Sequence, residues 1–261
     1  MTFHFESATH CGRVRTNNED ALAFDAEQQL ALLADGMGGY KAGEVASQMA
    51  TELVMQQVGQ WLDDAETAPT LAQLRPTLEV TLEAANRAIY QAAQADPDRA
   101  GMGTTLVMAV FQPSCVVIAH LGDSRCYRLR QHVLEPLTRD HSLVQEQLDA
   151  GLLTPQQAAA SGNRNLVTRA LGIEDAVAPE IREFPVQDGD LYLMCSDGLS
   201  DMLGDDEIAA VLDTSKTLAD KAAALVALAN AHGGHDNVSV LLAQATQPPN
   251  HRPLISRWLG F

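Results

Sequence analysis

Residues Leu30 to Gly39 read LALLADGMGG: a continuously apolar run ends in an aspartate and is followed by glycines. The run Leu30–Ala34 predicts a short buried strand, because it stops at residues that favour turns. Asp35 is therefore expected where the strand leaves the core. The glycines after it allow backbone angles and a close approach that other residues do not tolerate. Together these features would let a carboxylate and a neighbouring main-chain carbonyl face one cation.

The same design recurs where other apolar runs lead into LGDSR and CSDG, and around Asp236 in GGHDNVSVLL, where the glycines precede the aspartate and the apolar run follows it. The acidic residues in such contexts are Glu19, Asp20, Asp35, Asp123, Asp197 and Asp236. Mg²⁺ and Mn²⁺ prefer oxygen ligands, and carboxylates from separate strand ends can converge on two such ions, as in two-metal hydrolysis. Any single aspartate could instead cap a helix or shape a turn. The shared pattern favours a carboxylate-bound metal centre.

The composition is that of a globular protein, since 261 residues with 46% hydrophobic content can bury a full core. A formal charge of −17 argues against binding to a nucleic acid backbone or to an anionic membrane surface. No apolar run approaches the roughly 18 residues of a spanning helix, and the N-terminal residues lack the features of a signal peptide. We expect a cytoplasmic protein. Its cysteines form no C-x-x-C pair and are expected to be free thiols: Cys11, Cys115, Cys126 and Cys195.

Hydrophobic periodicity predicts amphipathic helices over 44–62, 71–95, 205–212 and 218–232. Strand patterns cover 3–8, 21–24, 30–34, four segments between 104 and 137, 178–184, 190–195 and 238–243. The four consecutive segments are joined by short turns, which predicts an antiparallel meander. Residues 141–177 lack the strand pattern and are expected to form a helical insert with a mobile polar centre. Runs of strands interleaved with helix pairs indicate an α+β sandwich of antiparallel sheets.

Two arginines, Arg13 and Arg15, lie in the polar stretch CGRVRTNNED. A guanidinium binds phosphate oxygens through two parallel hydrogen bonds, so either arginine suits a phosphate ester that is bridged by cations. In a strand both would lie on one face, and the pattern therefore does not choose between them. A surface arginine without such a role is the alternative for each.

Other motif interpretations fail. The stretch DGMGGYKAG has no G-K-[ST] and is not a P-loop, and the acidic spacing does not fit an EF-hand. His232 and His235, in HGGHD, suggest a zinc site only weakly, because no further cysteine or histidine cluster supports it. A helix end followed by a turn is the preferred interpretation of that stretch.

Eight motifs follow one another in the order VRTNNED, LADGMGG, GTT, GDSR, TRDHS, TRALG, CSDGLSD and HDNVSV. This ordered set resembles the bacterial metal-dependent Ser/Thr protein phosphatases of the PPM, or 2C, type over about residues 5–245. The resemblance implies a four-layer α-β-β-α sandwich, with two antiparallel sheets flanked by helix pairs and with metals in a cleft at one edge. It implies a catalytic domain at 1–245, with a flap at about 141–177, and a C-terminal tail at 246–261.

The resemblance also implies a metal centre of two Mn²⁺ or Mg²⁺ ions, with a third ion as an option. Asp35 would bridge the two core ions, and the carbonyl of Gly36 would bind one of them. Asp197 and Asp236 would complete the ligands of the other. Asp35 and Asp197 would thus be catalytic residues.

Further roles follow by the same resemblance. Glu19 and Asp20 would act mainly through metal-bound water, and Asp123 would hold the third, weaker metal. Arg15 would be the catalytic arginine that binds the substrate phosphate. Asn237 would lie in the second layer around the metals.

The implied activity is hydrolysis of phosphoserine and phosphothreonine in proteins by a water or hydroxide that bridges the metals. A monomer that opposes a bacterial Ser/Thr kinase is expected, with phosphorylated proteins, that kinase and its substrates as partners and no nucleic acid. One alternative is a phosphoprotein-binding regulator of the same fold with weak catalysis. A second alternative is a hydrolase of small phosphate esters or nucleotides.

One departure from the family concerns the proton donor. Eukaryotic members often carry histidine, the proposed general acid, where this chain has Met37. Methionine cannot donate a proton, and our hypothesis is that a water on the metal at Asp123 protonates the leaving group. His141 in TRDHS is another candidate acid, although a role in ordering its loop is the preferred interpretation.

Overall fold

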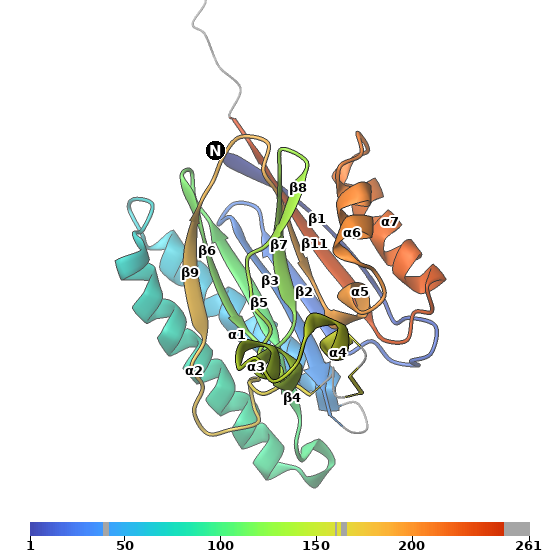
Figure 1. Cartoon of the computed structure of the whole chain (residues 1–261). Helices are drawn as coiled ribbons and strands as arrows, with labels where there is room; N and C mark the ends of the chain where they lie inside the picture. Colours follow the sequence, from blue (N-terminus) through green and yellow to red (C-terminus); the bar gives the residue numbers. More distant parts are fainter. Residues whose placement is uncertain (39–41, 160, 163–165, 248–261) are drawn as a thin grey trace, which may run out of the picture.

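The computed structural model describes residues 1–38, 42–159, 161–162 and 166–247. Two antiparallel β-sheets pack face to face, and helices cover both outer faces (Figure 1). The predicted α+β class and the α-β-β-α order of layers are confirmed. The C-terminal tail falls outside the described residues from position 248 onward.

Each sheet mixes strands from distant parts of the chain. The first has the order β1-β11-β10-β7-β8, formed by Thr2–His10 (β1), Val238–Thr246 (β11), Leu191–Cys195 (β10), Arg125–Arg130 (β7) and Val133–Pro136 (β8). The second has the order β2-β3-β5-β6-β9, formed by Asp20–Asp25 (β2), Leu30–Met37 (β3), Leu106–Phe111 (β5), Cys115–Leu121 (β6) and Glu180–Pro185 (β9). The short strand β4 (Gly103–Thr104) pairs with β3.

Two pairs of helices form the outer layers. Helices α1 (Ala42–Asp63) and α2 (Leu71–Ala95) cover the second sheet, while α6 (Asp205–Leu212) and α7 (Leu218–Ala231) cover the first. A 3₁₀ turn, η1 (Pro97–Arg99), follows α2, and the short helix α5 (Asp197–Ser200) follows β10. Helices are found where the sequence predicts them, and those over 71–95 and 205–212 have the predicted bounds.

The core explains why β3 is apolar without interruption. Leu30, Leu32 and Ala34 pack against the layer of α1 and α2, whereas Ala31 and Leu33 face the first sheet. Because successive side chains of a strand point to opposite faces, a strand that is covered on both faces needs apolar residues at every position.

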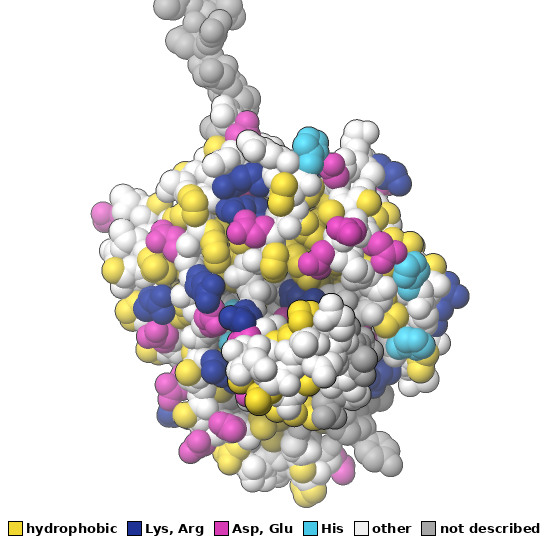
Figure 2. All heavy atoms as spheres, in the orientation of Figure 1, with side chains coloured by type: hydrophobic (Ala, Val, Ile, Leu, Met, Phe, Trp, Pro, Cys, Tyr) yellow, Lys and Arg dark blue, Asp and Glu magenta, His cyan; other side chains and the backbone are white. Residues whose placement is uncertain are grey.

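The face of the molecule drawn in Figure 2 carries side chains of both charges. Basic and acidic side chains are interspersed there (Figure 2). All four cysteines are free, as predicted. None of the helices in the described part of the chain is both long and apolar enough to cross a membrane.

The segment 141–177 contains the helical structure that its sequence predicts. Helices α3 (Leu143–Asp149) and α4 (Pro155–Ala159) lie side by side at one edge of the sandwich (Figure 1). One isolated bridge, between Ser142 and Val167, closes the segment on itself, and a second, between Leu171 and Thr104, ties it to the body. Much of the predicted polar centre, at residues 160 and 163–165, lies outside the described residues.

Two predictions about strands are wrong. Strands β5 and β6 pair, but β7 belongs to the other sheet, so no continuous meander forms. The chain crosses between the sheets at Gly122–Ser124, where Gly122 has a φ of +100° that redirects the backbone. Asp35 does not follow the strand but lies inside it, because pairing with β4 extends β3 to Met37.

Candidate metal centre

The acidic residues singled out by the sequence come together at one edge of the sandwich. A cavity of about 250 Å³ there, which we call the acidic cavity, is lined by Arg15, Glu19, Asp35, Gly36, Met37, Gly38, Thr105, Asp123, Val167, Asp197 and Asp236. Asp20 is not among these residues but lies directly opposite Asp35 in the β2–β3 pair. The structure thus assembles carboxylates from segments up to about two hundred residues apart in the chain.

Threonines of the GTT motif fix the backbone of Asp35. The Asp35 N–H donates to Thr105 Oγ1, with a nitrogen-to-oxygen distance of 3.0 Å. The Asp35 carbonyl accepts from the Thr105 N–H at 2.9 Å and from Thr104 Oγ1 at 2.9 Å. The GTT motif, whose sequence alone indicates no role, thus holds the strand that carries Asp35.

The glycines that follow two of the aspartates are required by close backbone packing. A Cβ atom on Gly36 would lie 2.1 Å from the carbonyl oxygen of Gly43 in α1. A Cβ atom on Gly198 would lie 1.9 Å from the carbonyl oxygen of Asn237. Each Asp-Gly pair therefore places a carboxylate at a point where two segments of backbone touch.

Asp123 and Asp197 reach the cavity from the first sheet and its connections. Asp197 begins α5 directly after β10, and Asp123 lies in the crossover from β6 to β7. The side chain of Asp123 is buried, with an exposed fraction of 7%. The chain crosses between the sheets here instead of continuing the predicted meander, and this crossover places Asp123 between the sheets.

Asn237 ties the loop that carries Arg15 to the start of β11. Its Oδ1 accepts from the Glu19 N–H at 2.7 Å, and its Nδ2 donates to the carbonyls of Asn17 at 2.8 Å and Cys11 at 3.1 Å. These bonds use every polar atom of the side chain, which is 5% exposed. Asn237 therefore acts on the cavity through the backbone around it.

The two arginines left open by the sequence take different positions. Residues 11–19 form a loop and not a strand, so the expected common face does not exist. Arg15 lines the acidic cavity, and its Nη2 lies 2.7 Å from Asp236 Oδ2. Arg13 is not among the lining residues, and its N–H donates to the Gly234 carbonyl at 2.7 Å.

Burial and mutual repulsion raise the pKa values of the clustered carboxyls. Desolvation, followed by the charges of neighbouring aspartates, raises the pKa of Asp35 and of Asp197 well above the usual range. Desolvation above all raises the pKa of Asp20 and of Asp123 to about 6. The pKa of Glu19 is also raised, mainly by desolvation.

The donor set fits divalent cations. Among the described residues that line the acidic cavity, Arg15 is the basic side chain, and it faces five acidic ones. One carboxylate oxygen, Asp20 Oδ1, is buried without a hydrogen-bond partner, although Oδ2 accepts from Ser196 Oγ at 2.9 Å. Because buried carboxylates need compensating charge, two or more hard cations would satisfy this cluster.

Two further aspartates, to which the sequence pattern assigned no role, adjoin the cluster. Asp140 and Asp201 line a neighbouring cavity of about 300 Å³ together with Asp123 and Asp197. Arg125 holds Asp140 through two bonds, from Nε at 2.8 Å and from Nη2 at 2.7 Å. Asp140 lies in the motif TRDHS and Asp201 in CSDGLSD, and this membership in the ordered motifs was the sequence feature that could have identified them.

A separate group of metal-type side chains, which sequence reasoning missed, consists of His120, His141 and Glu180. The His120 Nε2–H donates to the Arg139 carbonyl at 2.9 Å, and His141 Nδ1 accepts from the Gly122 N–H at 3.2 Å. Neutral His141 thus carries its proton on Nε2, which faces Glu180 Oε2 at 3.7 Å. Since a metal would need the lone pair of that nitrogen, this arrangement favours a buried polar contact over a metal site.

This chain is similar to known proteins over nearly its whole length. The serine/threonine phosphatase stp of Listeria monocytogenes is 40% identical over 244 residues, which cover 92% of this chain and 95% of that protein. The crystal structure of the serine/threonine phosphatase PstP/Ppp of Mycobacterium tuberculosis is 37% identical with a TM-score of 0.86, covering 95% of this chain and 100% of that one.

A solved catalytic domain of PstP in complex with two manganese ions has a TM-score of 0.82 and 37% identity, covering 94% of this chain and 99% of that one. Residues 9–234 match the sequence profile of protein phosphatase 2C. This profile match spans the first seven of the ordered motifs and ends just before HDNVSV, which the aligned relatives and structures cover by their longer extent. The chain belongs to the protein phosphatase 2C family.

Proposed function

We propose that this protein is a metal-dependent phosphatase that hydrolyses phosphoserine and phosphothreonine in proteins. The observation that carries the proposal is the acidic cavity, where buried carboxyls with raised pKa values face a single described arginine. The related Listeria monocytogenes protein is named a serine/threonine phosphatase, and a related PstP structure holds two manganese ions. These relatives support both the substrate class and the need for a divalent metal.

The proposed ligands of the two core cations are Asp35, the carbonyl of Gly36, Asp197 and Asp236. Glu19 and Asp20 would support the cations through water, and Asp123 would bind a third. When bound, such cations neutralise phosphoryl charge and activate water for attack at neutral pH. We propose Mn²⁺ or Mg²⁺, because both favour the oxygen donors present here.

The proposed role of Arg15 is to bind the phosphoryl group of the substrate. Its side chain is 54% exposed and already extends over the cavity toward Asp236. A guanidinium in this position can form two parallel hydrogen bonds to phosphate oxygens. Asn237 would keep Arg15 in place by fixing the backbone of its loop.

The proton for the leaving alkoxide needs a source other than Met37, which lines the acidic cavity but has no proton to give. We assign this role to the site at Asp123, which lines the same cavity. His141 is not among the lining residues, and its backbone N–H donates to the Gly122 carbonyl at 2.9 Å. This contact supports the loop-ordering interpretation of His141.

In the cell we propose a monomer in the cytoplasm that reverses a Ser/Thr kinase. Catalysis would reside in residues 1–245, with 141–177 as a flap that influences substrate choice. The alternative of a regulator that binds phosphoproteins without turnover is not favoured, because none of the expected carboxylates is replaced. The second alternative, a hydrolase of small phosphate esters or nucleotides, would be distinguished by comparing the turnover of phosphopeptides with that of nucleotides.

The deciding experiment measures phosphate release from a phosphothreonine peptide across a Mn²⁺ titration. We expect release that depends on Mn²⁺ in the wild type and falls by at least about 10²-fold in Asp197→Ala, since that variant loses a proposed ligand. Asp64→Ala, which changes an exposed aspartate at the end of α1, should retain full activity. No release from folded wild-type protein at any Mn²⁺ or Mg²⁺ concentration would refute the proposal.

A further inference from the structure

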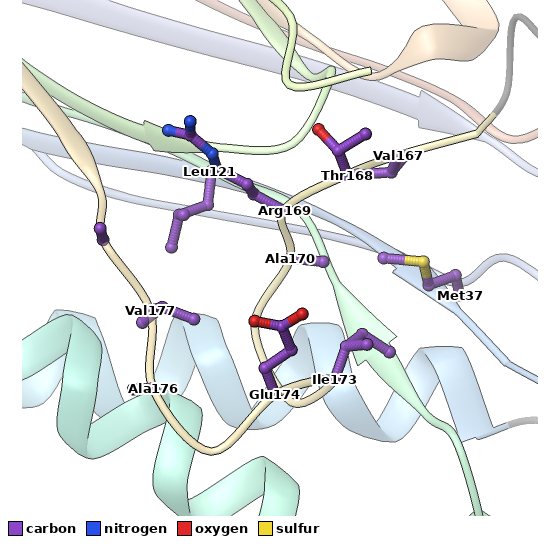
Figure 3. A pocket seen from close by; sticks show the side chains of 11 residues that line it. Met37, Leu121, Val167, Thr168, Arg169, Ala170, Ile173, Glu174, Ala176 and Val177 are labelled. Atoms are coloured by element: carbon purple, nitrogen blue, oxygen red, sulfur yellow. The ribbon is translucent and has the colours of Figure 1, made fainter. Parts of the chain in front are cut away.

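A second cavity, of about 550 Å³, adjoins the acidic cavity and shares Met37 and Val167 with it. We call it the apolar cavity, because Leu121, Ile173 and Val177 complete a mostly aliphatic wall. Figure 3 shows the chain from Val167 to Val177 curving around this space, with the side chain of Ile173 extending toward Met37. A bound phosphoprotein would thus meet this aliphatic surface next to the acidic cavity.

The wall is held in place by contacts with the body of the domain. Asn86 of α2, which is fully buried, accepts from the Gly172 N–H at 2.7 Å and donates to the Glu174 carbonyl at 2.9 Å. One residue earlier, Leu171 forms two backbone hydrogen bonds with Thr104, at 2.9 and 3.0 Å. The segment that carries Ile173 is therefore anchored on both sides of that residue.

Ile173 remains substantially exposed in spite of this anchoring. Its exposed fraction is 45%, and Gly103 leaves space for it, since a Cβ atom there would lie 2.6 Å from Ile173 Cδ1. Aliphatic surface that is rigidly held beside a reaction site and rimmed by polar groups is typical of a ligand subsite. The polar groups here are Thr168, Arg169 and Glu174.

We infer that the apolar cavity binds an aliphatic or aromatic side chain of the protein substrate, close in sequence to the phosphorylated residue. The inference rests on the proposed function, because it requires the phosphoryl group to occupy the acidic cavity. In an extended peptide, side chains two positions apart point to the same side and are about 7 Å apart. The occupant is therefore the side chain two positions before or after the phosphorylated residue.

The experiment uses phosphothreonine peptides that differ only at the positions two before and two after phosphothreonine, with leucine or serine at each. The selectivity ratio is kcat/KM for the leucine peptide divided by kcat/KM for the serine peptide, measured with saturating Mn²⁺. At one of the two positions we expect a ratio of about ten or more in the wild type, mainly through KM, since an apolar subsite contributes binding.

Two variants alter the apolar cavity in opposite ways. Ile173→Asp makes its wall charged, and Ala176→Phe fills part of its volume. Both are expected to bring the selectivity ratio to about one, because the first makes the wall unfavourable for an apolar side chain and the second occupies the space that this side chain would enter. Val133→Asp is the matched control: Val133 lies on β8, outside both cavities, with an exposed fraction of 65%, and this variant should keep the wild-type ratio.

The selectivity ratio compares two peptides on the same protein, so a variant that lowers kcat/KM equally for both peptides leaves the ratio unchanged. A wild-type ratio near one at both positions, or an unchanged ratio in both cavity variants, would overturn the inference. Mn²⁺-dependent hydrolysis of p-nitrophenyl phosphate and of the serine peptides by the wild type tests the proposed function separately. If that hydrolysis is absent, the proposed function fails; if it is present without peptide selectivity, only the apolar subsite fails.

Discussion

The acidic cavity and the apolar cavity adjoin at Met37 and Val167, but different kinds of backbone carry their side chains. The acids come from several distant segments, which are fixed by strand pairing and by hydrogen bonds to Thr105 and Asn237. Much of the apolar wall comes from one continuous segment, residues 167–178, which is anchored at a few points. The first cavity is a product of the sheets, and the second is largely a product of one loop.

This difference suggests a division of labour between chemistry and substrate choice. A loop can change its side chains without moving strands that are held in register, whereas a shift in those strands would move every acid. Changes in the acidic cavity should therefore lower the rate for the leucine and the serine peptides alike and leave the selectivity ratio unchanged. Changes in the apolar cavity should alter the ratio itself.

The largest expected difference between substrates concerns Asp123, which lines the acidic cavity but not the apolar one. Asp123→Ala should lower kcat for a phosphoserine peptide by about 10²-fold, the usual contribution of a proton donor. The loss for p-nitrophenyl phosphate should be much smaller, since its leaving group needs little protonation. The selectivity ratio should stay at the wild-type value.

Steady-state kinetics with both substrates would test this assignment of Asp123. Asp188→Ala, an exposed aspartate before β10, is the matched control and should change neither rate. Equal losses on the peptide and on p-nitrophenyl phosphate would show that Asp123 does not serve leaving-group protonation.

The next effect concerns the pH dependence of stability without divalent metal. In the folded state the pKa values of Asp20 and Asp123 are raised to about 6, compared with about 3.9 in an unfolded chain. The folded state therefore binds more protons between these values. The resulting stabilisation, up to about 3 kcal/mol for each group, is present below pH 4 and is lost as the pH rises through about 6.

Melting temperatures in EDTA from pH 4 to pH 8 would measure this contribution. The wild type should lose stability with rising pH relative to Asp123→Asn, and saturating Mn²⁺ at pH 7.5 should restore it, because metal binding needs deprotonated ligands. If the melting temperatures of the two proteins changed with pH in parallel, this would contradict the raised pKa of Asp123. Ile173→Asp, which changes only the apolar cavity, should show the same dependence of melting temperature on pH in EDTA as the wild type.

The smallest expected effect concerns Asn237, which acts through the loop of Arg15. Asn237→Ala leaves the Glu19 N–H and two carbonyls without their partner, and we expect kcat/KM to fall by about tenfold. The fall should be equal for the leucine and serine peptides. A change in their ratio would show that the two cavities are coupled through this loop, against the proposed division of labour.

Local sequence patterns were sufficient for most individual elements. The helix over 71–95 was predicted from apolar residues at helical spacing, and α2 has those bounds. The run Leu30–Ala34 was predicted as a buried strand, and it forms most of β3. These predictions succeed because the pattern of side chains that must be buried depends mainly on the element itself.

Pairing between distant segments was the main source of error. The sequence predicted a meander through Gly122, but the chain crosses there to the other sheet. The strands before and after the turn share the central apolar layer, while their outer faces pack against different helix layers. Arg13 and Arg15 could not be distinguished, since the conformation of their loop depends on contacts with Gly234 and Asn237. Neither contact is encoded within the loop.

The sequence by itself determined that several carboxylates stand next to apolar runs and near glycines, and the ordered motifs indicated the family. Only the tertiary structure decided which of these side chains share one cavity, that Thr104 and Thr105 hold Asp35, and that an aliphatic cavity adjoins the acids. The physical reason is that side-chain type and spacing are local properties. A cavity is made by backbones that meet from distant parts of the chain, and its shape exists only once they have packed.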